Sequence, residues 1–113
     1  MQIIYHLARD RAWREAAETG RYRCTADDLR DGFLHFSAGD QIVESAARHK
    51  AGQPDLVLLA VDAGLLGDTL RWEVSRGGAL FPHLYGDLPA SAVLWAKPLP
   101  LGPDGAHAFP PLD

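Results

Sequence analysis

The sequence has a single cysteine and no long hydrophobic run. A lone Cys24 excludes an internal disulfide and is compatible with a reducing compartment. The longest apolar run, from Leu56 to Val61, is far too short to span a bilayer. The N-terminal segment also lacks the basic and apolar regions of a secretory signal. We therefore expect a cytoplasmic protein with no membrane partner.

The chain also lacks an excess of positive charge, because 11 Lys and Arg face 15 Asp and Glu, and the formal net charge is −4. No basic stripe is visible on either side of His35, which argues against duplex nucleic acid as a partner. Arg21 and Arg23 lie close to Cys24 and would favour its thiolate, but a reactive thiol needs a specific local field. We expect Cys24 to be inert.

Familiar catalytic motifs are missing too. The sequence contains no Walker loop, no Gly-x-Gly-x-x-Gly after a predicted strand, no His-Glu-x-x-His and no Gly-x-Ser-x-Gly. These absences argue against a P-loop ATPase, a Rossmann enzyme, a zincin and an α/β-hydrolase.

What the sequence does have is an ordinary globular composition, with 47% hydrophobic and 23% charged residues over 113 positions, enough for one compact core. Hydrophobic periodicity, turn residues and capping residues predict its elements. Helices are expected from Asp10 to Gly20, from Thr25 to Arg30 and from Asp40 to Gly52, the second with an Asp28 capping box. Strands are expected over residues 2–7, 33–37, 55–62, 69–75, 80–85 and 92–96.

Two of these strands indicate how the sheet is covered. Residues 55–62 contain Leu-Val-Leu-Leu-Ala-Val without alternation, which is typical of a central strand covered on both faces. Residues 69–75 alternate between apolar and polar side chains, as in a half-buried strand. The order of elements predicts an α+β fold with mainly antiparallel strands, in one domain over residues 1–99. The Pro- and Gly-rich residues 100–113 are expected to form an irregular C-terminal tail over the surface.

Three histidines, His6, His35 and His83, lie inside short aromatic or aliphatic runs of the predicted strands. A polar ring in such a place needs a hydrogen-bond partner. A backbone carbonyl could satisfy each ring separately, but three of them in separate strands suggest a shared polar pocket. His49 at a helix end and His107 in the tail are expected to be exposed.

Period-two geometry predicts which polar side chains share a strand face. His35 lies with Ser37, Arg71 with Glu73, and His83 with Tyr85. Imidazoles and Ser37 would bond hydroxyl groups, and Arg71 would pair with phosphate. Tyr85 or Phe81 would stack on a ring, so this chemistry suggests a nucleotide or sugar phosphate ligand.

Two alternatives stand beside this interpretation. Arg71 and Glu73 could simply pair with each other at the surface. The three histidines could instead hold a metal, since imidazole is a common zinc ligand, and this would make the protein a metal-dependent hydrolase. None of the usual short ligand spacings is present, however.

Several motifs, taken in order from Gln2 to about Leu99, resemble a family of small bacterial proteins known as domain of unknown function 952. The matching segments are Ile4-Tyr5-His6, Gly20-x-Tyr22, Gly32-Phe33-Leu34-His35-Phe36-Ser37, Leu70-Arg71-Trp72-Glu73 and Phe81-Pro82-His83-Leu84-Tyr85-Gly86. This family is similar to the ADP-ribosyltransferase-like fold. The resemblance implies two small, mainly antiparallel sheets, two to three helices, and a nicotinamide-nucleotide cleft between the sheets.

The resemblance also implies roles for particular residues. Tyr5-His6 resembles the Tyr-His pair of the His-type transferases and of RNA 2′-phosphotransferases, whose histidine contacts a nucleotide ribose. His35-Phe36-Ser37 resembles the His-x-x-Ser-like strand of the phosphotransferases, with one intervening residue here. The Gly-Thr or Gly-Ser that commonly follows the first histidine is Leu7-Ala8 in this chain.

From these likenesses we expect a domain that binds a small-molecule nucleotide such as NAD or ADP-ribose, either an ADP-ribosyl or phosphoryl transferase or a non-catalytic binding module. His6, His35 and Glu73 are the expected catalytic residues. The two histidines would orient ribose, and Glu73 would stabilise positive charge at the anomeric carbon. The expected ligand-binding residues are Tyr5, Ser37, Arg71, His83 and Tyr85.

Overall fold

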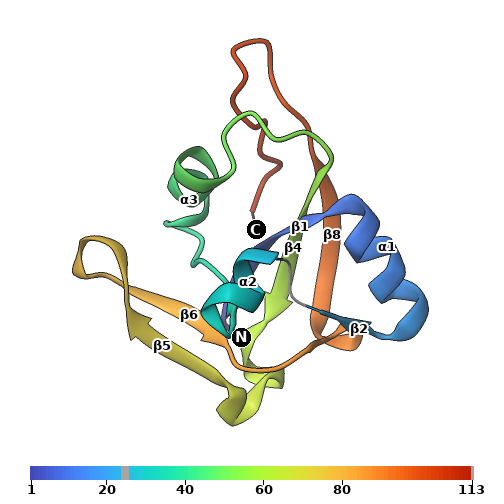
Figure 1. Ribbon diagram of the computed structural model, residues 1–113, viewed down its shortest axis with the longest axis vertical. Helices are drawn as coiled ribbons and strands as arrows, with labels where there is room; N and C mark the ends of the chain where they lie inside the picture. Colours follow the sequence, from blue (N-terminus) through green and yellow to red (C-terminus); the bar gives the residue numbers. More distant parts are fainter. Residues whose placement is uncertain (24–25, 113) are drawn as a thin grey trace.

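A computed structural model describes residues 1–23 and 26–112, and two three-stranded antiparallel sheets form its framework (Figure 1). The first sheet has the order β1-β4-β8, with β1 at Ile3–Arg9, β4 at Leu56–Asp62 and β8 at Val93–Leu99. The second has the order β3-β6-β5, with β3 at Leu34–His35, β6 at Leu80–Leu84 and β5 at Leu70–Val74. A short ribbon pairs β2 (Arg21–Tyr22) with β7 (Leu88–Pro89).

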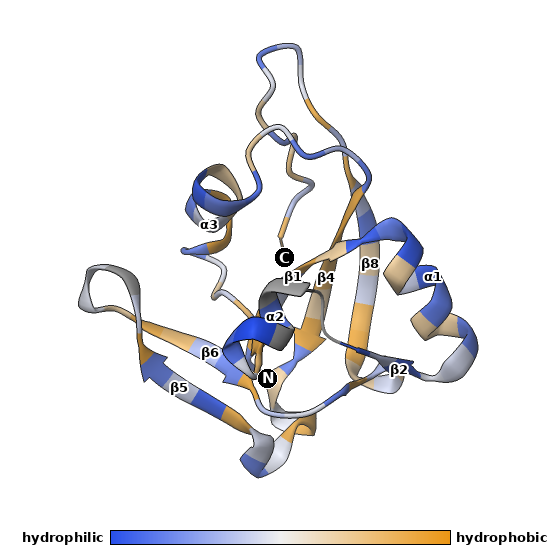
Figure 2. Cartoon of the chain, in the orientation of Figure 1, coloured by the Kyte–Doolittle hydropathy of each residue, from blue (hydrophilic) through white to orange (hydrophobic). Residues whose placement is uncertain are grey.

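Helices cover both faces of the first sheet. Helix α1 (Asp10–Thr19) packs on the face that carries Ile4 and Leu59, and α3 (Ile42–His49) packs on the face that carries Leu58. These faces follow from the alternation of side chains along a strand. Figure 1 shows α1 and α3 on opposite sides of β4, and Figure 2 shows the hydrophobic residues along that strand.

The central position predicted for residues 55–62 is confirmed. Strand β4 lies between β1 and β8, and its residues from Leu56 to Val61 are all buried. A strand covered on both faces has no polar side to present, which is why its sequence does not alternate.

The second sheet joins the first at the free edge of β1. Tyr5 N donates to Ser37 O at 2.8 Å and Ser37 N donates to Tyr5 O at 2.9 Å. Leu34, Leu84 and Trp72, on one face of the second sheet, pack into the same hydrophobic core as Ile4 and Leu59. The opposite face therefore carries the polar side chains of β3, β5 and β6.

The short helix α2 (Ala26–Asp31) precedes β3 and lies where the predicted second helix was expected. Cys24 and Thr25 fall outside the described residues, and so does the helix cap expected at Thr25. The α+β class with small antiparallel sheets is confirmed. Within the described residues, no helix has the length and apolar character needed to cross a membrane.

Two strand predictions need correction, and one short ribbon was not predicted. The strand expected over 33–37 is shorter, with β3 limited to Leu34–His35. Phe36 N still donates to Pro82 O of β6 at 3.0 Å, and the chain then pairs with β1 at Ser37. The last strand runs past residue 96 to Leu99 and includes Pro98. Pro98 fits because β8 is an edge strand, where a missing N–H can face solvent. The β2–β7 ribbon was not predicted, because two-residue strands have no periodic signal.

The C-terminal residues 100–112 cross the α3 side of the first sheet as an irregular segment. Phe109 and Leu112 pack on the core around Ile42, and the Tyr5 hydroxyl donates a hydrogen bond to the Leu112 carbonyl. The prediction that His107 is exposed is wrong. Its ring is half-buried, and Nε2 lies 2.9 Å from the carbonyl oxygen of Gln53.

Truncation of the central strand should show where the stability resides. Leu59 is fully buried, so Leu59→Ala is expected to lower the free energy of unfolding by about 2–5 kcal/mol in a denaturant titration. Leu65 is 61% exposed, and the matched control Leu65→Ala should change it by less than about 0.5 kcal/mol. Equal losses in the two variants would contradict this assignment of the core.

Candidate functional site

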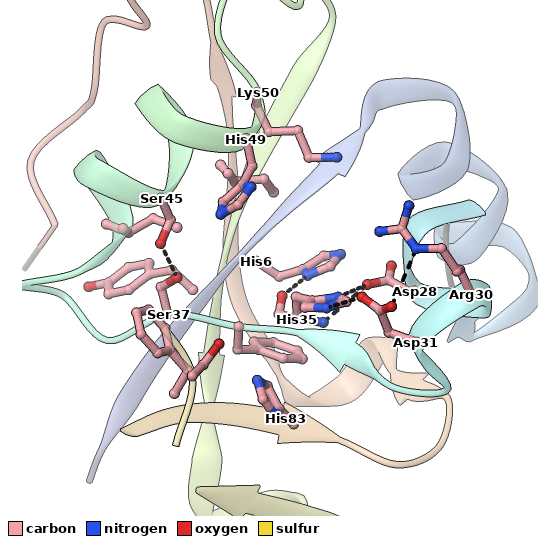
Figure 3. A pocket seen from close by; sticks show the side chains of 16 residues that line it. His6, Asp28, Arg30, Asp31, His35, Ser37, Ser45, His49, Lys50 and His83 are labelled. Carbon is pink, nitrogen blue, oxygen red and sulfur yellow. Dashed lines mark hydrogen bonds and ion pairs between the residues drawn. The ribbon is translucent and has the colours of Figure 1, made fainter. Parts of the chain in front are cut away.

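A pocket of about 300 Å³ lies where the free edge of β1 meets the second sheet, with α2 and α3 at its sides (Figure 3). It brings together the three histidines of the predicted strands. Tyr5 and Ser37, two of the expected ligand-binding residues, also line it. Two other expected ligand-binding residues, Arg71 and Tyr85, lie outside its lining, and so does Glu73, which was expected to be catalytic.

His6 is buried and uses both ring nitrogens inside the protein. Its Nδ1 lies 2.6 Å from the carbonyl oxygen of His35, and its Nε2 lies 3.1 Å from the hydroxyl oxygen of Tyr22. A carbonyl can only accept, so Nδ1 carries the proton and Nε2 accepts from Tyr22 in the neutral ring. Burial lowers the pKa of His6 and favours that neutral form. His6 thus ties β1 to β3.

His35 is held between two carboxylates of α2. Its Nδ1 lies 2.6 Å from Asp28 Oδ1, and its Nε2 lies 2.9 Å from Asp31 Oδ2. Asp28 Oδ1 also accepts the backbone N–H of His35 at 3.1 Å. The hydrogen bond that His35 donates to Asp28 and the charges of both carboxylates raise the pKa of His35. The arrangement favours an imidazolium that donates from both nitrogens.

Sequence reasoning missed Asp28 and Asp31 as partners of His35. It placed Asp28 in a helix cap, whereas the structure directs Oδ1 of this buried carboxylate to His35. The sequence shows only that Asp28 and Asp31, three apart on one helix, share a face, and that His35 comes four residues after the end of that helix. The contact of these two carboxylates with the His35 ring could not be predicted from spacing alone.

Positive charge reaches the pocket from two elements. Arg30 of α2 and Lys50 at the end of α3 both line it, and Arg30 Nε lies 3.3 Å from Asp31 Oδ1. This contact is the main cause of the lowered pKa of Asp31. His49 was expected to be exposed, and it is, but it lines the same pocket.

Hydroxyl groups form a third part of the lining. The Ser37 and Ser45 hydroxyl oxygens lie 2.9 Å apart, and both residues are buried. Ser45 comes from α3, so this contact fixes the helix against the segment that follows β3. Ser75 and Phe81 complete the wall near the β5–β6 hairpin.

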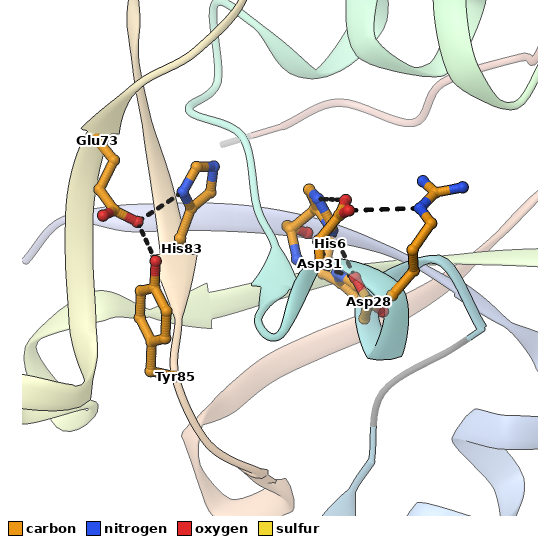
Figure 4. A network of polar contacts seen from close by, with 8 residues as sticks. His6, Asp28, Asp31, Glu73, His83 and Tyr85 are labelled. Carbon is orange, nitrogen blue, oxygen red and sulfur yellow. Dashed lines mark hydrogen bonds and ion pairs between the residues drawn. The ribbon is translucent and has the colours of Figure 1, made fainter.

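The polar residues of β5 and β6 form a cluster beside the pocket (Figure 4). Glu73 Oε1 lies 2.9 Å from His83 Nδ1 and accepts from the Tyr85 hydroxyl at 2.6 Å. These two hydrogen bonds, Tyr85 first, lower the pKa of Glu73, and the same contact raises the pKa of Tyr85. The Arg71 guanidinium lies over the Tyr85 ring, 5.3 Å from its centroid.

Phe33 connects this cluster to His35 and was not among the predicted site residues. Its ring stacks on His83 with centroids 4.0 Å apart and an interplanar angle of 21°, and it lies 4.6 Å from the His35 ring. The ring of His83 is therefore fixed on one face by an aromatic side chain.

A three-histidine metal site does not emerge from this geometry. Across residues 1–23 and 26–112, no group of three or more His, Cys, Asp or Glu side chains is placed to hold a metal ion. The reason lies in the hydrogen bonds, because His6 and His35 each engage both ring nitrogens within the protein.

Comparison with known proteins now identifies the family. A family model described as a protein of unknown function, DUF952, matches residues 7–96. The chain belongs to the DUF952 family. The resemblance drawn from the sequence motifs is thereby confirmed.

Solved structures of a bacterial protein are also similar to this chain. The crystal structure of protein CC0527 from Caulobacter crescentus is 48% identical, with a TM-score of 0.89, and the match covers 94% of this chain and 93% of that chain. A solution NMR structure of CC0527 is 49% identical, with a TM-score of 0.82, covering 94% of this chain and 91% of that chain. A search of curated proteins finds no match.

The titration of the pocket histidines tests the electrostatic description. We expect the pKa of His35 to lie above its ordinary value of about 6.5, and that of His6 to lie below it. Asp31→Asn should lower the pKa of His35 by removing one carboxylate, whereas Asp68→Asn, at a distant exposed carboxylate, should not. Imidazole proton shifts followed by NMR over pH give these values.

The two shifts have opposite consequences for stability. His35 stabilises the folded protein at pH values below its ordinary pKa, and this contribution to the free energy of unfolding is lost as pH rises through its raised pKa. The contribution of His6 to the free energy of unfolding is present at pH values above its ordinary pKa and is lost as pH falls through its lowered pKa. A His6 pKa above that of His35 would contradict both assignments.

Proposed function

We propose that this chain is a nucleotide-binding domain with an ADP-ribosyltransferase-like fold, whose pocket takes a phosphorylated ribose ligand of the NAD or ADP-ribose class. The observation that carries the proposal is the joint presence of cations, hydroxyl groups and an aromatic ring in one pocket between two small antiparallel sheets. The arrangement of the sheets supports the fold likeness, because the implied nucleotide cleft lies between two such sheets.

Each part of such a ligand has a matching side chain in the lining. Arg30 and Lys50 supply the positive charge that a phosphate requires. The hydroxyls of Ser37 and Ser45 bond ribose hydroxyl groups. Phe81, which comes from β6 and lines the pocket, offers an aromatic surface to a base or a nicotinamide ring.

The volume limits how much of a dinucleotide the pocket encloses. About 300 Å³ lies at the lower end of the range of roughly 300–1,000 Å³ found for ligand pockets. One nucleoside phosphate portion would be enclosed, and the rest of NAD would extend along the polar face of β5 and β6. There Arg71 and Tyr85 would contact it, as their expected ligand-binding roles require.

The proposal gives the expected catalytic residues different tasks. His6 acts through the His35 carbonyl, so its part is to position β3 rather than to contact ribose with a ring nitrogen. His35 presents the edge of a ring that is 41% exposed. Glu73 lies outside the lining, and its Oε1 is engaged by His83 and Tyr85.

Calorimetry with NAD, ADP-ribose and a 2′-phosphorylated nucleotide tests the proposal. Wild-type protein should bind at least one of them. Lys50→Gln should weaken that binding by about tenfold or more, because a charge-assisted hydrogen bond to phosphate contributes about 1.5–3 kcal/mol. Lys97→Gln, on β8 beside Trp95, is the matched control and should bind as the wild type does. Absence of binding at millimolar ligand, or equal losses in the two variants, would refute the proposal.

Transfer chemistry is a second candidate, favoured by the contact between the Glu73 carboxylate and the pocket residue His83. Chromatographic measurement of nicotinamide released from NAD distinguishes a transferase from a non-catalytic binding module. Release by wild-type protein above the level of Glu73→Gln would select a transferase. Binding without release would select the non-catalytic module.

A further inference from the structure

His83 differs from the other two pocket histidines in how its ring nitrogens are used. Glu73 Oε1 lies 2.9 Å from Nδ1. The lowered pKa of Glu73 keeps this carboxyl ionised near neutral pH, so it can only accept a hydrogen bond. The proton of this contact therefore resides on Nδ1, and the neutral ring has a bare lone pair on Nε2.

The bare nitrogen belongs to a ring that lines the pocket. His83 lines the pocket, and among the described residues no protein group bonds to its Nε2. Figure 4 shows Glu73 reaching the ring from the side away from His6. His6 and His35, in contrast, each engage both nitrogens with protein groups.

Three constraints fix the ring before any ligand arrives. His83 lies on β6, the middle strand of the second sheet, opposite His35 on one side and Arg71 on the other. Phe33 stacks on its face at 4.0 Å. The Tyr85 hydroxyl bonds the same oxygen of Glu73 and so holds the carboxylate in place. A group held in this way needs little reorganisation when it reacts.

We propose that His83 is the proton acceptor of the pocket, with Glu73 as its positioning residue, and that it takes the proton of a hydroxyl group or water molecule held there. In this step the O–H bond breaks, the electron pair stays on oxygen, and the proton forms a bond to Nε2. The ring becomes an imidazolium whose charge is stabilised by the Glu73 carboxylate, as in other carboxylate–histidine pairs. The inference requires a ligand or water with an O–H group, but not a nucleotide.

The tautomer of His83 tests the inference without any ligand. Long-range proton–nitrogen NMR of the neutral ring should show Nδ1 protonated and Nε2 bare. In Glu73→Ala the two nitrogen shifts should exchange toward the Nε2–H form that free imidazole side chains favour. Glu44→Ala, which removes a glutamate from the outer face of α3, is the control and should keep the wild-type pattern. A wild-type ring protonated on Nε2, or no change in Glu73→Ala, would overturn the inference.

Chemical modification of the wild-type protein gives a second test of the bare His83 nitrogen. Diethylpyrocarbonate reacts with bare imidazole nitrogens, so peptide mass spectrometry should find His83 modified faster than His6 or His35. Equal rates at the three rings, or an inert His83, would contradict the inference. Both experiments omit nucleotide, so a protein that passes them and fails to bind NAD or ADP-ribose separates this inference from the proposed function.

Discussion

The free edge of β1 has to be paired, and the way it is paired determines the site. An unpaired strand edge leaves backbone donors and acceptors without partners. Here Ser37 closes part of that edge through two hydrogen bonds to Tyr5, and the His6 side chain adds a third contact to the His35 carbonyl. The chain makes these contacts by passing from β6, where Phe36 N still donates to Pro82 O, to β1 at Ser37. The two sheets meet along this line, and the pocket lies against it.

Three histidines lie around this junction, and the neighbours of each ring give it a different role. His6 is between a carbonyl and a hydroxyl, so it is neutral and structural. His35 is between two carboxylates, so it favours the charged form. His83 has one carboxylate on Nδ1, lines the pocket, and has no protein partner on its other nitrogen among the described residues. Desolvation and nearby charge thus separate residues that the sequence presents as equivalent.

The features that the sequence predicted are those with local signals. The apolar run of β4 indicated a strand with two covered faces, and the hydrophobic contexts of His6, His35 and His83 indicated buried rings in need of partners. Alternation correctly placed Arg71, Glu73 and His83 on the polar faces of β5 and β6. Tyr85 comes just after β6, and its hydroxyl reaches the same group through Glu73.

Features that depend on pairing between distant segments could not be predicted in this way. Glu73 was expected either to pair with Arg71 or to act on a ligand, whereas register across β5 and β6 brings it to His83. Asp28 has an ordinary helix-capping pattern in the sequence, and only the fold brings it to His35. Pro98 ended the last predicted strand because an edge position is not visible in the sequence.

This chain belongs to the DUF952 family and has similar solved structures, and the pocket beside β1 gives it a proposed chemistry. The most direct test is chemical-shift mapping of the backbone amides while ADP-ribose is added to wild-type protein. The account predicts changes concentrated in residues 28–37, 45–50 and 81–83, which contain most of the pocket lining. Changes confined to α1 or to residues 100–112, or no changes at millimolar ligand, would contradict it.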